Sequence, residues 1–283
     1  MLNKYVYDSK ISGPRLLLLG AVHGNETAGS KEILKLKEAL DNKKICLKSG
    51  CLTLMPVCNP LAHAKGVRYV EKNLNRLIRL YEKPSCPEEE FAHEVASEIL
   101  KNDYVLDLHS THNAGEPPFA FLDYPSAENQ KLVAAVDVPY VICNWPEIYK
   151  NAPITDYCTE YFAHASGKSC ITLECGYHYD AASQITASES IYNLLARFGM
   201  IDRQIKERTK KYLDLQEVVV KKRSGRLQKN YRHLDRVSAG EVIGIYDNGE
   251  KVVASKNGYI LIPNHEAADN TEWFYLAVAK TAD

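Results

Sequence analysis

Short apolar runs alternate with segments of helical periodicity over the first 200 residues, and this alternation limits the chain to few folds. Residues 28–40 are one such segment, because Ile33, Leu36 and Leu40 recur at helical spacing. A short apolar run between helices is typical of a strand buried in a parallel sheet. We therefore predict an α/β domain with a mainly parallel mixed sheet. Predicted strands cover residues 16–19, 51–57, 104–108, 138–143 and 170–173, and predicted helices cover residues 28–40, 88–100 and 189–198.

The pattern changes after residue 208. Short β-type runs then follow one another at residues 217–220, 241–246, 251–254, 259–262 and 273–278. The turn sequences Asp-Asn-Gly, Lys-Asn-Gly and Ser-Ala-Gly, which begin at residues 247, 256 and 238, are of the kind that close β-hairpins. We expect an α/β domain over residues 1–208 and a small C-terminal all-β domain over residues 209–283.

Charge and composition exclude several classes of partner. The 283 residues include 35 Lys and Arg against 36 Asp and Glu, so neither a nucleic acid nor a membrane is predicted as a partner. The N-terminus lacks the apolar core of a signal peptide, and no later stretch is apolar enough for a membrane span. We expect a cytoplasmic protein whose eight scattered cysteines are reduced.

Three residues of metal-binding type follow predicted strands. His23 and Glu26 come after the run at 16–19, and His109 ends the run that begins at residue 104. Ligand sites in parallel α/β sheets lie at the carboxyl ends of the strands. Two imidazoles and one carboxylate form the ligand set of a catalytic zinc that leaves a fourth position open. Each residue also has a simpler interpretation, as a helix start for Glu26 or a core histidine for His109, but their common position favours one zinc per chain.

A third predicted strand, at residues 170–173, is followed by Glu174. A carboxylate that lies beside a zinc-activated water without binding the metal is what a general base for hydrolysis requires. We therefore predict that Glu174 is catalytic. Cys175 is a weaker candidate, because the sequence offers no oriented histidine–acid pair to activate it as a nucleophile.

The segment after the predicted strand at 51–57 contains Arg68, Asn75 and Arg76. Guanidinium groups hold carboxylates in bidentate fashion, and an arginine near zinc can stabilise a developing oxyanion. By charge alone these arginines would more often lie on the surface. Their place on a loop at the predicted strand edge favours a role in the site.

Six short motifs resemble the succinylglutamate desuccinylase/aspartoacylase family, which belongs to the zinc carboxypeptidase superfamily. In the family's order they are His-Gly-Asn-Glu-Thr-Ala at 23–28, Asn-Pro at 59–60, Arg-Tyr at 68–69, Asn-Leu-Asn-Arg at 73–76, Asp-Leu-His at 107–109 and Thr-Leu-Glu at 172–174. The resemblance implies a zinc-carboxypeptidase-like catalytic domain followed by a small β domain.

The resemblance also implies a role for each candidate residue. His23, Glu26 and His109 would bind zinc. Glu174 would activate the water and later protonate the leaving amine. Arg68 would polarise the scissile carbonyl as a second catalytic residue. Asn75 and Arg76 would hold a carboxylate of the amino-acid part of the substrate.

The predicted activity is zinc-dependent hydrolysis of an amide bond in a small N-acyl amino acid or a related N-acylated amine. The same site could instead serve a zinc carboxypeptidase that acts on peptides or cell-wall fragments. In a non-catalytic alternative the β domain is a carrier module, which would need an exposed lysine at a hairpin tip. The sequence gives no prediction of oligomeric state.

Two departures from the family pattern bear on the substrate. Asn73 stands where the family often has Asp. Aspartoacylases also use an additional arginine, upstream of the catalytic glutamate, to hold a second carboxylate, whereas no arginine occurs here between residues 80 and 196. The missing arginine predicts a preference for derivatives of neutral or basic amino acids.

Overall fold

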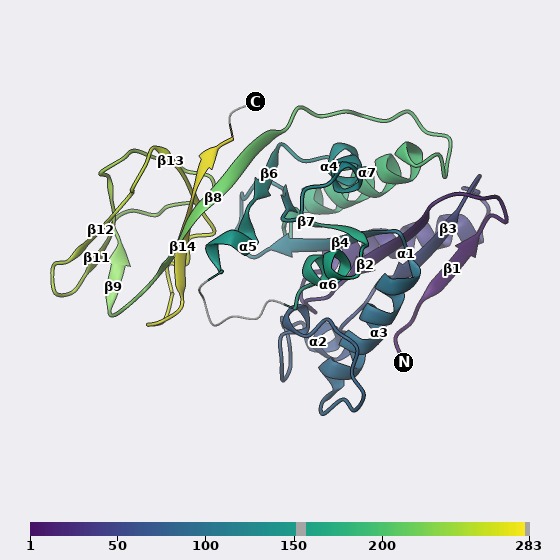
Figure 1. Ribbon diagram of the computed structural model, residues 1–283, viewed down its shortest axis with the longest axis horizontal. Coiled ribbons are helices and arrows are strands. Elements are labelled where there is room, and N and C mark those ends of the chain that lie inside the picture. Colours follow the sequence, from purple (N-terminus) through teal and green to yellow (C-terminus); the bar gives the residue numbers. More distant parts are fainter. Residues whose placement is uncertain (151–156, 281–283) are drawn as a thin grey trace. The chain divides into compact units, whose positions relative to one another are not determined.

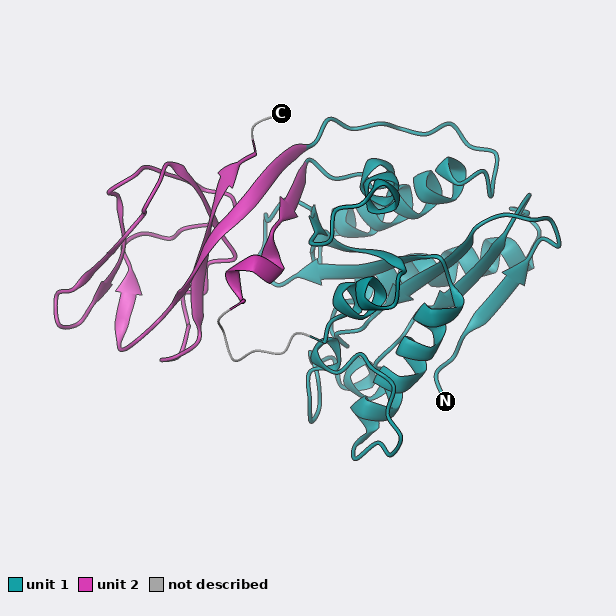
Figure 2. Ribbon diagram, in the orientation of Figure 1, with its two compact units in different colours: residues 1–139, 155–210 teal, residues 140–154, 211–283 magenta. Residues whose placement is uncertain are grey.

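The computed structural model describes residues 1–150 and 157–280, which divide into two compact units (Figure 2). The first unit comprises residues 1–139 and 155–210, and the second comprises residues 140–154 and 211–283. The second unit therefore takes in a segment from the middle of the chain as well as the C-terminal stretch. In the described part of the chain, no helix combines the length and the apolar character needed to span a membrane.

The first unit is built on a mixed sheet in which four strands are parallel (Figure 1). The strand order is β1 (Tyr5–Asp8), β3 (Cys51–Met55), β2 (Arg15–Gly20), β4 (Tyr104–Thr111), β7 (Ser169–Tyr177) and β5 (Phe119–Leu122). β3, β2, β4 and β7 run parallel, whereas β1 and β5 run antiparallel to their neighbours β3 and β7. The predicted α/β fold with a mainly parallel mixed sheet is confirmed.

Helices cover both faces of this sheet (Figure 1). On one face α7 (Ala181–Arg197) packs against α1 (Thr27–Asp41) and α4 (Ala127–Ala135). On the other face α3 (Pro87–Lys101) packs against α6 (Thr159–Ala165) and the short 3-10 turn η1 (Leu74–Arg76). The short helix α2 (Pro60–Lys65) follows β3.

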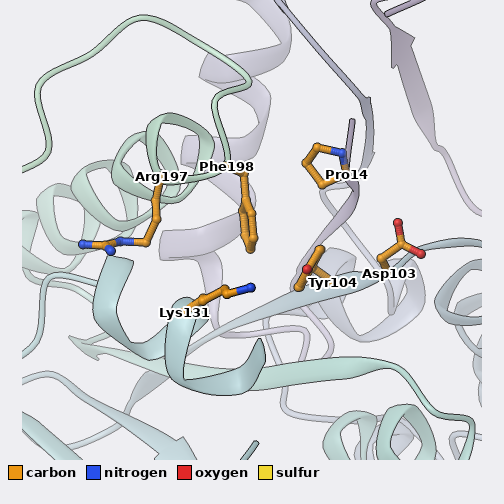
Figure 3. Close-up of a pocket in the computed structure, with 6 residues that line it drawn as sticks. All are labelled: Pro14, Asp103, Tyr104, Lys131, Arg197 and Phe198. Atoms are coloured by element: carbon orange, nitrogen blue, oxygen red, sulfur yellow. The ribbon is translucent and has the colours of Figure 1, made fainter. Parts of the chain in front are cut away.

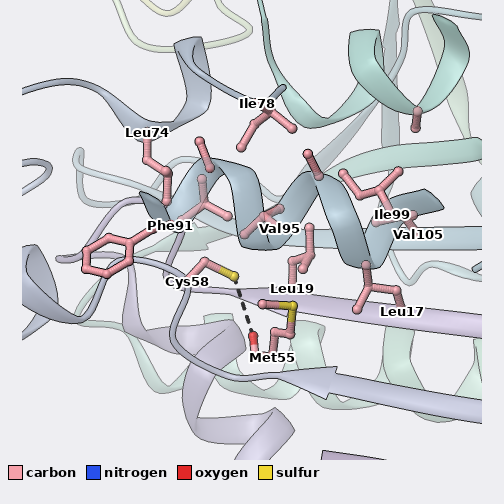
Figure 4. Close-up of a cluster of buried hydrophobic side chains, with 14 of the residues drawn as sticks. Leu17, Leu19, Met55, Cys58, Leu74, Ile78, Phe91, Val95, Ile99 and Val105 are labelled. Atoms are coloured by element: carbon pink, nitrogen blue, oxygen red, sulfur yellow. Dashed lines mark hydrogen bonds between the residues drawn. The ribbon is translucent and has the colours of Figure 1, made fainter. Parts of the chain in front are cut away.

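One hydrophobic cluster joins α3 to the sheet (Figure 4). Val95 and Ile99 lie one helical turn apart on α3, and both are fully buried. They belong to the same cluster as Leu17 and Leu19 of β2 and Val105 of β4, which alternate with residues facing the other side of the sheet. Burial of each such side chain contributes about 1.5–3 kcal/mol. The cluster therefore fixes β2 and β4, the strands that lead to the two histidines.

The second unit is almost entirely β-structure, so the predicted C-terminal β region is present. One sheet has the order β6 (Tyr140–Cys143), β8 (Lys211–Val220), β14 (Glu272–Ala279), β13 (Gly258–Leu261) and β10 (Arg236–Val237). A second sheet contains β12 (Lys251–Val253), β11 (Val242–Tyr246) and β9 (Gly225–Leu227), and one short helix, α5 (Trp145–Ile148), follows β6. The buried core of this unit includes Trp273 and Phe274.

One of the three turn sequences closes a hairpin. Asp-Asn-Gly at 247–249 joins the paired strands β11 and β12, and its tip holds no lysine of the kind a carrier module needs. The hairpins expected at 238–240 and 256–258 are wrong, because each of these turns connects strands of different sheets. Gly258 instead allows close strand approach, since a Cβ there would lie 2.2 Å from the carbonyl oxygen of Ala277.

Candidate metal centre

The three predicted metal ligands lie toward the carboxyl ends of the parallel strands. His23 and Glu26 lie in the turn between β2 and α1, and His109 lies near the end of β4. The turn packs tightly against α2, because a Cβ on Gly24 would lie 2.3 Å from the carbonyl carbon of Ala62. A side chain at this position is therefore excluded, and the backbone between the first two ligands is held in place.

The ligand atoms of these residues face one another. His23 Nδ1 lies 2.9 Å from Glu26 Oε1 and 3.1 Å from His109 Nδ1, and His109 Nδ1 lies 2.8 Å from Glu26 Oε2. All three side chains are buried. Ligands about 2.0–2.1 Å from a tetrahedral zinc ion lie roughly 3.3 Å from one another. The residues therefore fit a single zinc ion with only small movements.

Charges around His109 favour a cation at this position. Asp107 Oδ2 lies 2.9 Å from the Nε2 atom of His109, while Glu26 lies at Nδ1. Burial by itself lowers the pKa of His109, but these two carboxylates raise it well above its usual value. Burial by itself raises the pKa of Glu26, but His23 and His109 hold it well below its usual value. Positive charge is therefore strongly stabilised between these carboxylates, as metal binding requires.

Further polar groups orient the other two ligands. His23 Nε2 lies 3.1 Å from Asn73 Oδ1, which places the ring hydrogen on Nε2 and leaves Nδ1 able to bind a metal. Burial lowers the pKa of His23 to about 4, so the ring is neutral. Glu26 accepts the backbone N–H of Ser110 at 3.1 Å through Oε2 and Arg68 NH1 at 2.8 Å through Oε1. Each carboxylate oxygen of Glu26 thus has a fixed direction.

Glu174 lies opposite His109 in the parallel pairing of β7 with β4. Its Oε2 atom is buried and has no hydrogen-bond partner among the described residues. Burial, and then the negative charge of Glu26, raises the pKa of Glu174 to about 8. A carboxyl group with this pKa and a free oxygen can both accept and donate a proton near neutral pH.

The other predicted site residues lie on the segment between β3 and α3. The Arg68 side chain is 48% exposed even though it bonds to Glu26, so part of its guanidinium group can reach a ligand. Asn75 and Arg76 lie in η1, where Arg76 NH1 donates to the backbone oxygen of Asn75 at 2.7 Å. Asn75 is linked to the metal cluster, because its backbone N–H donates to Asn73 Oδ1 at 3.0 Å.

Several polar residues around the cluster have no role that the sequence predicts. Asp107 carried a usable signal, because residues two apart on a strand share a face and His109 follows it at that spacing. Ser110 Oγ lies 2.8 Å from His178 Nδ1, and Thr159 bonds to Asp107 at 2.7 Å. Both of these contacts join residues more than 50 positions apart, so no local sequence pattern predicts them.

A separate pocket of about 470 Å³ opens at the amino end of the strands (Figure 3). It is lined by Pro14, Asp103, Tyr104, Lys131, Arg197 and Phe198. Tyr104 begins β4, whose other end carries His109, so this pocket and the metal cluster lie at opposite edges of the sheet. None of the predicted site residues lines it.

Comparison with known sequences points to one family. A model of the succinylglutamate desuccinylase/aspartoacylase catalytic domain matches residues 12–196. The succinylglutamate desuccinylase of Pseudomonas putida is 34% identical over 132 residues, which are 44% of this chain and 38% of that protein. A probable aspartoacylase of Nostoc sp. is 31% identical over 106 residues, which are 34% of this chain and 35% of that protein. The chain thus spans less than two fifths of the length of these curated relatives.

Solved structures share the fold. The ectoine utilization protein EutE (DoeB) from Ruegeria pomeroyi, in a product-bound structure, has a TM-score of 0.79 at 19% identity, covering 98% of this chain and 88% of that one. The succinylglutamate desuccinylase/aspartoacylase from Rhodobacter sphaeroides has a TM-score of 0.77 at 17% identity, covering 95% and 87%. At these identities the likeness establishes the architecture.

Proposed function

This chain belongs to the succinylglutamate desuccinylase/aspartoacylase family, and from that premise we propose that it is a zinc-dependent hydrolase. Its reaction would be cleavage of the amide bond of a small N-acyl amino acid or a related N-acylated amine. One observation carries the proposal: the buried ligand atoms of His23, Glu26 and His109 converge, and Glu174 lies on the neighbouring strand with a free carboxylate oxygen.

In this proposal Glu174 transfers the protons of the reaction. Zinc held by the three ligands would supply positive charge that polarises the scissile carbonyl and makes a water molecule more acidic. Glu174 would accept the proton of the attacking water and then donate it to the leaving amine. Burial of Glu174, which raises the pKa of this carboxyl in the metal-free chain, favours its protonated form and so supports this second step.

Arg68, Asn75 and Arg76 would bind the substrate. Arg68 is anchored to Glu26 and partly exposed, so it can place a positive charge where the carbonyl oxygen becomes negative. Arg76 and Asn75 would hold the carboxylate of the amino-acid part, the guanidinium in bidentate fashion. The chain of contacts from Asn75 through Asn73 to His23 supports a fixed distance between this carboxylate and the metal.

We further propose that derivatives of neutral or basic amino acids are preferred. With no arginine between residues 80 and 196, a second substrate carboxylate has no guanidinium from that segment to bind it, and a lysine would offer only a point charge. A missing ion pair of this kind reduces kcat/KM by roughly tenfold or more.

Metal analysis and a substrate panel test these proposals together. We expect one zinc per chain in freshly purified protein, and hydrolysis of N-acetyl derivatives of neutral and basic amino acids. These should be cleaved at least about tenfold more efficiently than N-acetylaspartate and N-succinylglutamate. A preference for either dicarboxylate would contradict the substrate proposal, and protein purified without any first-row metal would contradict the zinc proposal. Dipeptides serve as the control, since faster cleavage of dipeptides would favour the carboxypeptidase alternative.

A further inference from the structure

Thr159, the first residue of α6, contacts both halves of the candidate site. Its hydroxyl donates to Asp107 Oδ2 at 2.7 Å, and its backbone N–H donates to Asn75 Oδ1 at 3.2 Å. Thr159 and Asp107 are fully buried, and Asn75 is 9% exposed. Two hydrogen bonds from one residue therefore lead to the metal cluster on one side and to the substrate-binding turn on the other.

The metal side of this connection acts through Asp107. Its Oδ2 atom lies 2.9 Å from His109 Nε2 and accepts the Thr159 hydroxyl, while its Oδ1 atom has no hydrogen-bond partner in the described part of the chain. The contact between Asp107 and His109 is an ion pair without hydrogen-bond geometry, because Nε2 has no hydrogen-bond partner in the described part of the chain, and the buried charge of the carboxylate favours one orientation of the ring. Thr159 in turn fixes this carboxylate, so its hydroxyl helps to aim Nδ1 of His109 at the metal.

The substrate side acts through the orientation of the Asn75 side chain. An amide presents an acceptor on one side and two donors on the other. Because the Thr159 N–H is a donor, it requires the Asn75 oxygen to face it, and the Asn75 NH₂ group is then turned away from α6. The bond therefore selects which end of the amide is offered to a substrate carboxylate.

Neighbouring contacts strengthen the same connection. The backbone N–H of Ile78 donates to the oxygen of Tyr157 at 2.8 Å, and the Arg79 guanidinium lies over the Tyr157 ring at 5.2 Å. Residues 157–159 are thus bonded along residues 75–79. The start of α6 holds the substrate-binding turn at several points, and Thr159 is the point that also reaches the metal cluster.

Helix capping does not account for these bonds. The N-cap of α6 is Cys158, whose Sγ accepts the backbone N–H of Tyr161 at 3.4 Å. Thr159 follows the cap, at a position where neither its hydroxyl nor its N–H is needed within the helix. Both donors instead bond to residues of the candidate site, the hydroxyl to Asp107 and the N–H to Asn75.

We propose that Thr159 is a positioning residue that sets the distance and orientation between the metal ligands and the carboxylate-binding side chains. The inference rests on the proposed function for the identity of the metal and the substrate. Thr159 would support both parts of the site. Loss of its hydroxyl would weaken metal binding, and loss of its N–H would loosen the turn at residues 75–79.

Three substitutions separate the two bonds. Thr159→Val removes the hydroxyl and keeps the shape and the N–H, whereas Thr159→Ser keeps both bonds. Thr159→Pro removes both. The first position of a helix and the extended backbone of Cys158 accept proline, and its Cδ would also displace Asn75 Oδ1, which lies 3.2 Å from the backbone nitrogen of Thr159. Thr186→Val, in the buried face of α7, is the matched control for loss of a buried threonine hydroxyl.

The first readout is zinc affinity, measured on the full chain by competition with a chelator. Thr159→Val and Thr159→Pro should each weaken zinc binding by about 10–100-fold. Thr159→Ser should restore it to near the wild-type value, and Thr186→Val should leave it unchanged. Wild-type zinc affinity in Thr159→Val would overturn the inference, as would an equal loss in the control.

The second readout is hydrogen exchange of the backbone over residues 73–79, which needs no substrate. Exchange there should be faster in Thr159→Pro than in wild type and unchanged in Thr159→Val. KM for the best substrate of the panel should rise about tenfold in Thr159→Pro alone. Equal exchange in both variants would overturn the link to Asn75.

If wild-type protein binds zinc but cleaves no N-acyl amino acid, the proposed function fails, whereas zinc affinity and exchange still decide the role of Thr159.

Discussion

Charged side chains form close pairs near both ends of the parallel strands in the first unit, in very different surroundings. At the carboxyl end, Glu26 and Asp107 flank His109 at 2.8 and 2.9 Å, and all three are almost completely buried. At the amino end, beside the pocket of Figure 3, Lys131 pairs with Glu128 at 2.6 Å, with side chains 54% and 41% exposed. The pairs have similar distances, so distance does not distinguish them.

Burial makes the difference between the two ends. Water screens the exposed pair, and such pairs contribute at most about 1 kcal/mol. The buried groups have no such screening, so their pKa values move away from the usual ones and each charge requires a specific partner. An open pocket is therefore a weaker guide to chemistry here than a cluster of buried charges that stabilises a cation.

The largest expected effect tests the carboxyl end. Glu174→Gln should bind zinc as wild type does but lose turnover by about 10²–10⁴-fold, because an amide cannot accept the proton of the attacking water. Steady-state kinetics on zinc-loaded protein measure the effect. Glu128→Gln at the amino end is the control and should keep full activity. Zinc loss in Glu174→Gln would make Glu174 a metal ligand, and retained activity would exclude it as the base.

A smaller effect concerns stability, through the buried carboxyl of Glu160 in α6. Burial raises its pKa to about 7, although it accepts the backbone N–H of Thr172 at 2.7 Å. A carboxyl whose pKa is higher in the folded state binds more protons there than when unfolded, so this group lowers stability as pH rises from about 4.5 to 7. Glu160→Gln removes that loss, so its free energy of unfolding relative to wild type should increase by up to about 3 kcal/mol between pH 5 and pH 8.

Urea unfolding of metal-free protein at the two pH values measures this difference. Glu207→Gln is a suitable control, because that side chain is 78% exposed and its removal should give no comparable dependence on pH. A constant difference between Glu160→Gln and wild type from pH 5 to pH 8 would show that Glu160 stays ionised in the folded state.

The smallest effect belongs to the amino end. Lys131→Ala should change the free energy of unfolding by less than about 0.5 kcal/mol, because its partner Glu128 remains solvated. Zinc affinity and kcat/KM should equal those of wild type. A clear loss of activity in this variant would show that the pocket takes part in the reaction, and the contrast between the two ends would then fail.

The sequence predicted the strands whose burial is continuous and missed elements that lack such a pattern. β2 and β4 appear as apolar runs because helices cover both of their sides, and the polar residues after those runs therefore drew attention. The four-residue strand β5 gave no comparable signal. α7 begins at Ala181, eight residues before its predicted start, because the Asp180 side chain accepts the Ala182 N–H and caps the helix there.

In the candidate site, too, the sequence predicted some features and missed others. The sequence predicted that His23, Glu26 and His109 would converge, because strand order places the carboxyl ends of parallel strands together, and their ligand atoms do face one another. The contacts of Thr159 with Asp107 and Asn75 span 52 and 84 positions and depend on where α6 packs. Contacts between side chains so far apart along the chain produce no periodic pattern in the sequence, so only the folded structure shows them.

The separation of the ligands along the chain also sets the order in which the cluster is made. His23 and Glu26 are neighbours on one turn, but 86 positions separate His23 from His109. During synthesis the third ligand is added roughly 4–17 s after the first. A nascent chain therefore carries only two of the three predicted ligands until β4 is made and pairs with β2. Retention of the proposed zinc ion against a chelator would consequently be a sign of completed strand pairing, and would report on chain folding as directly as on chemistry.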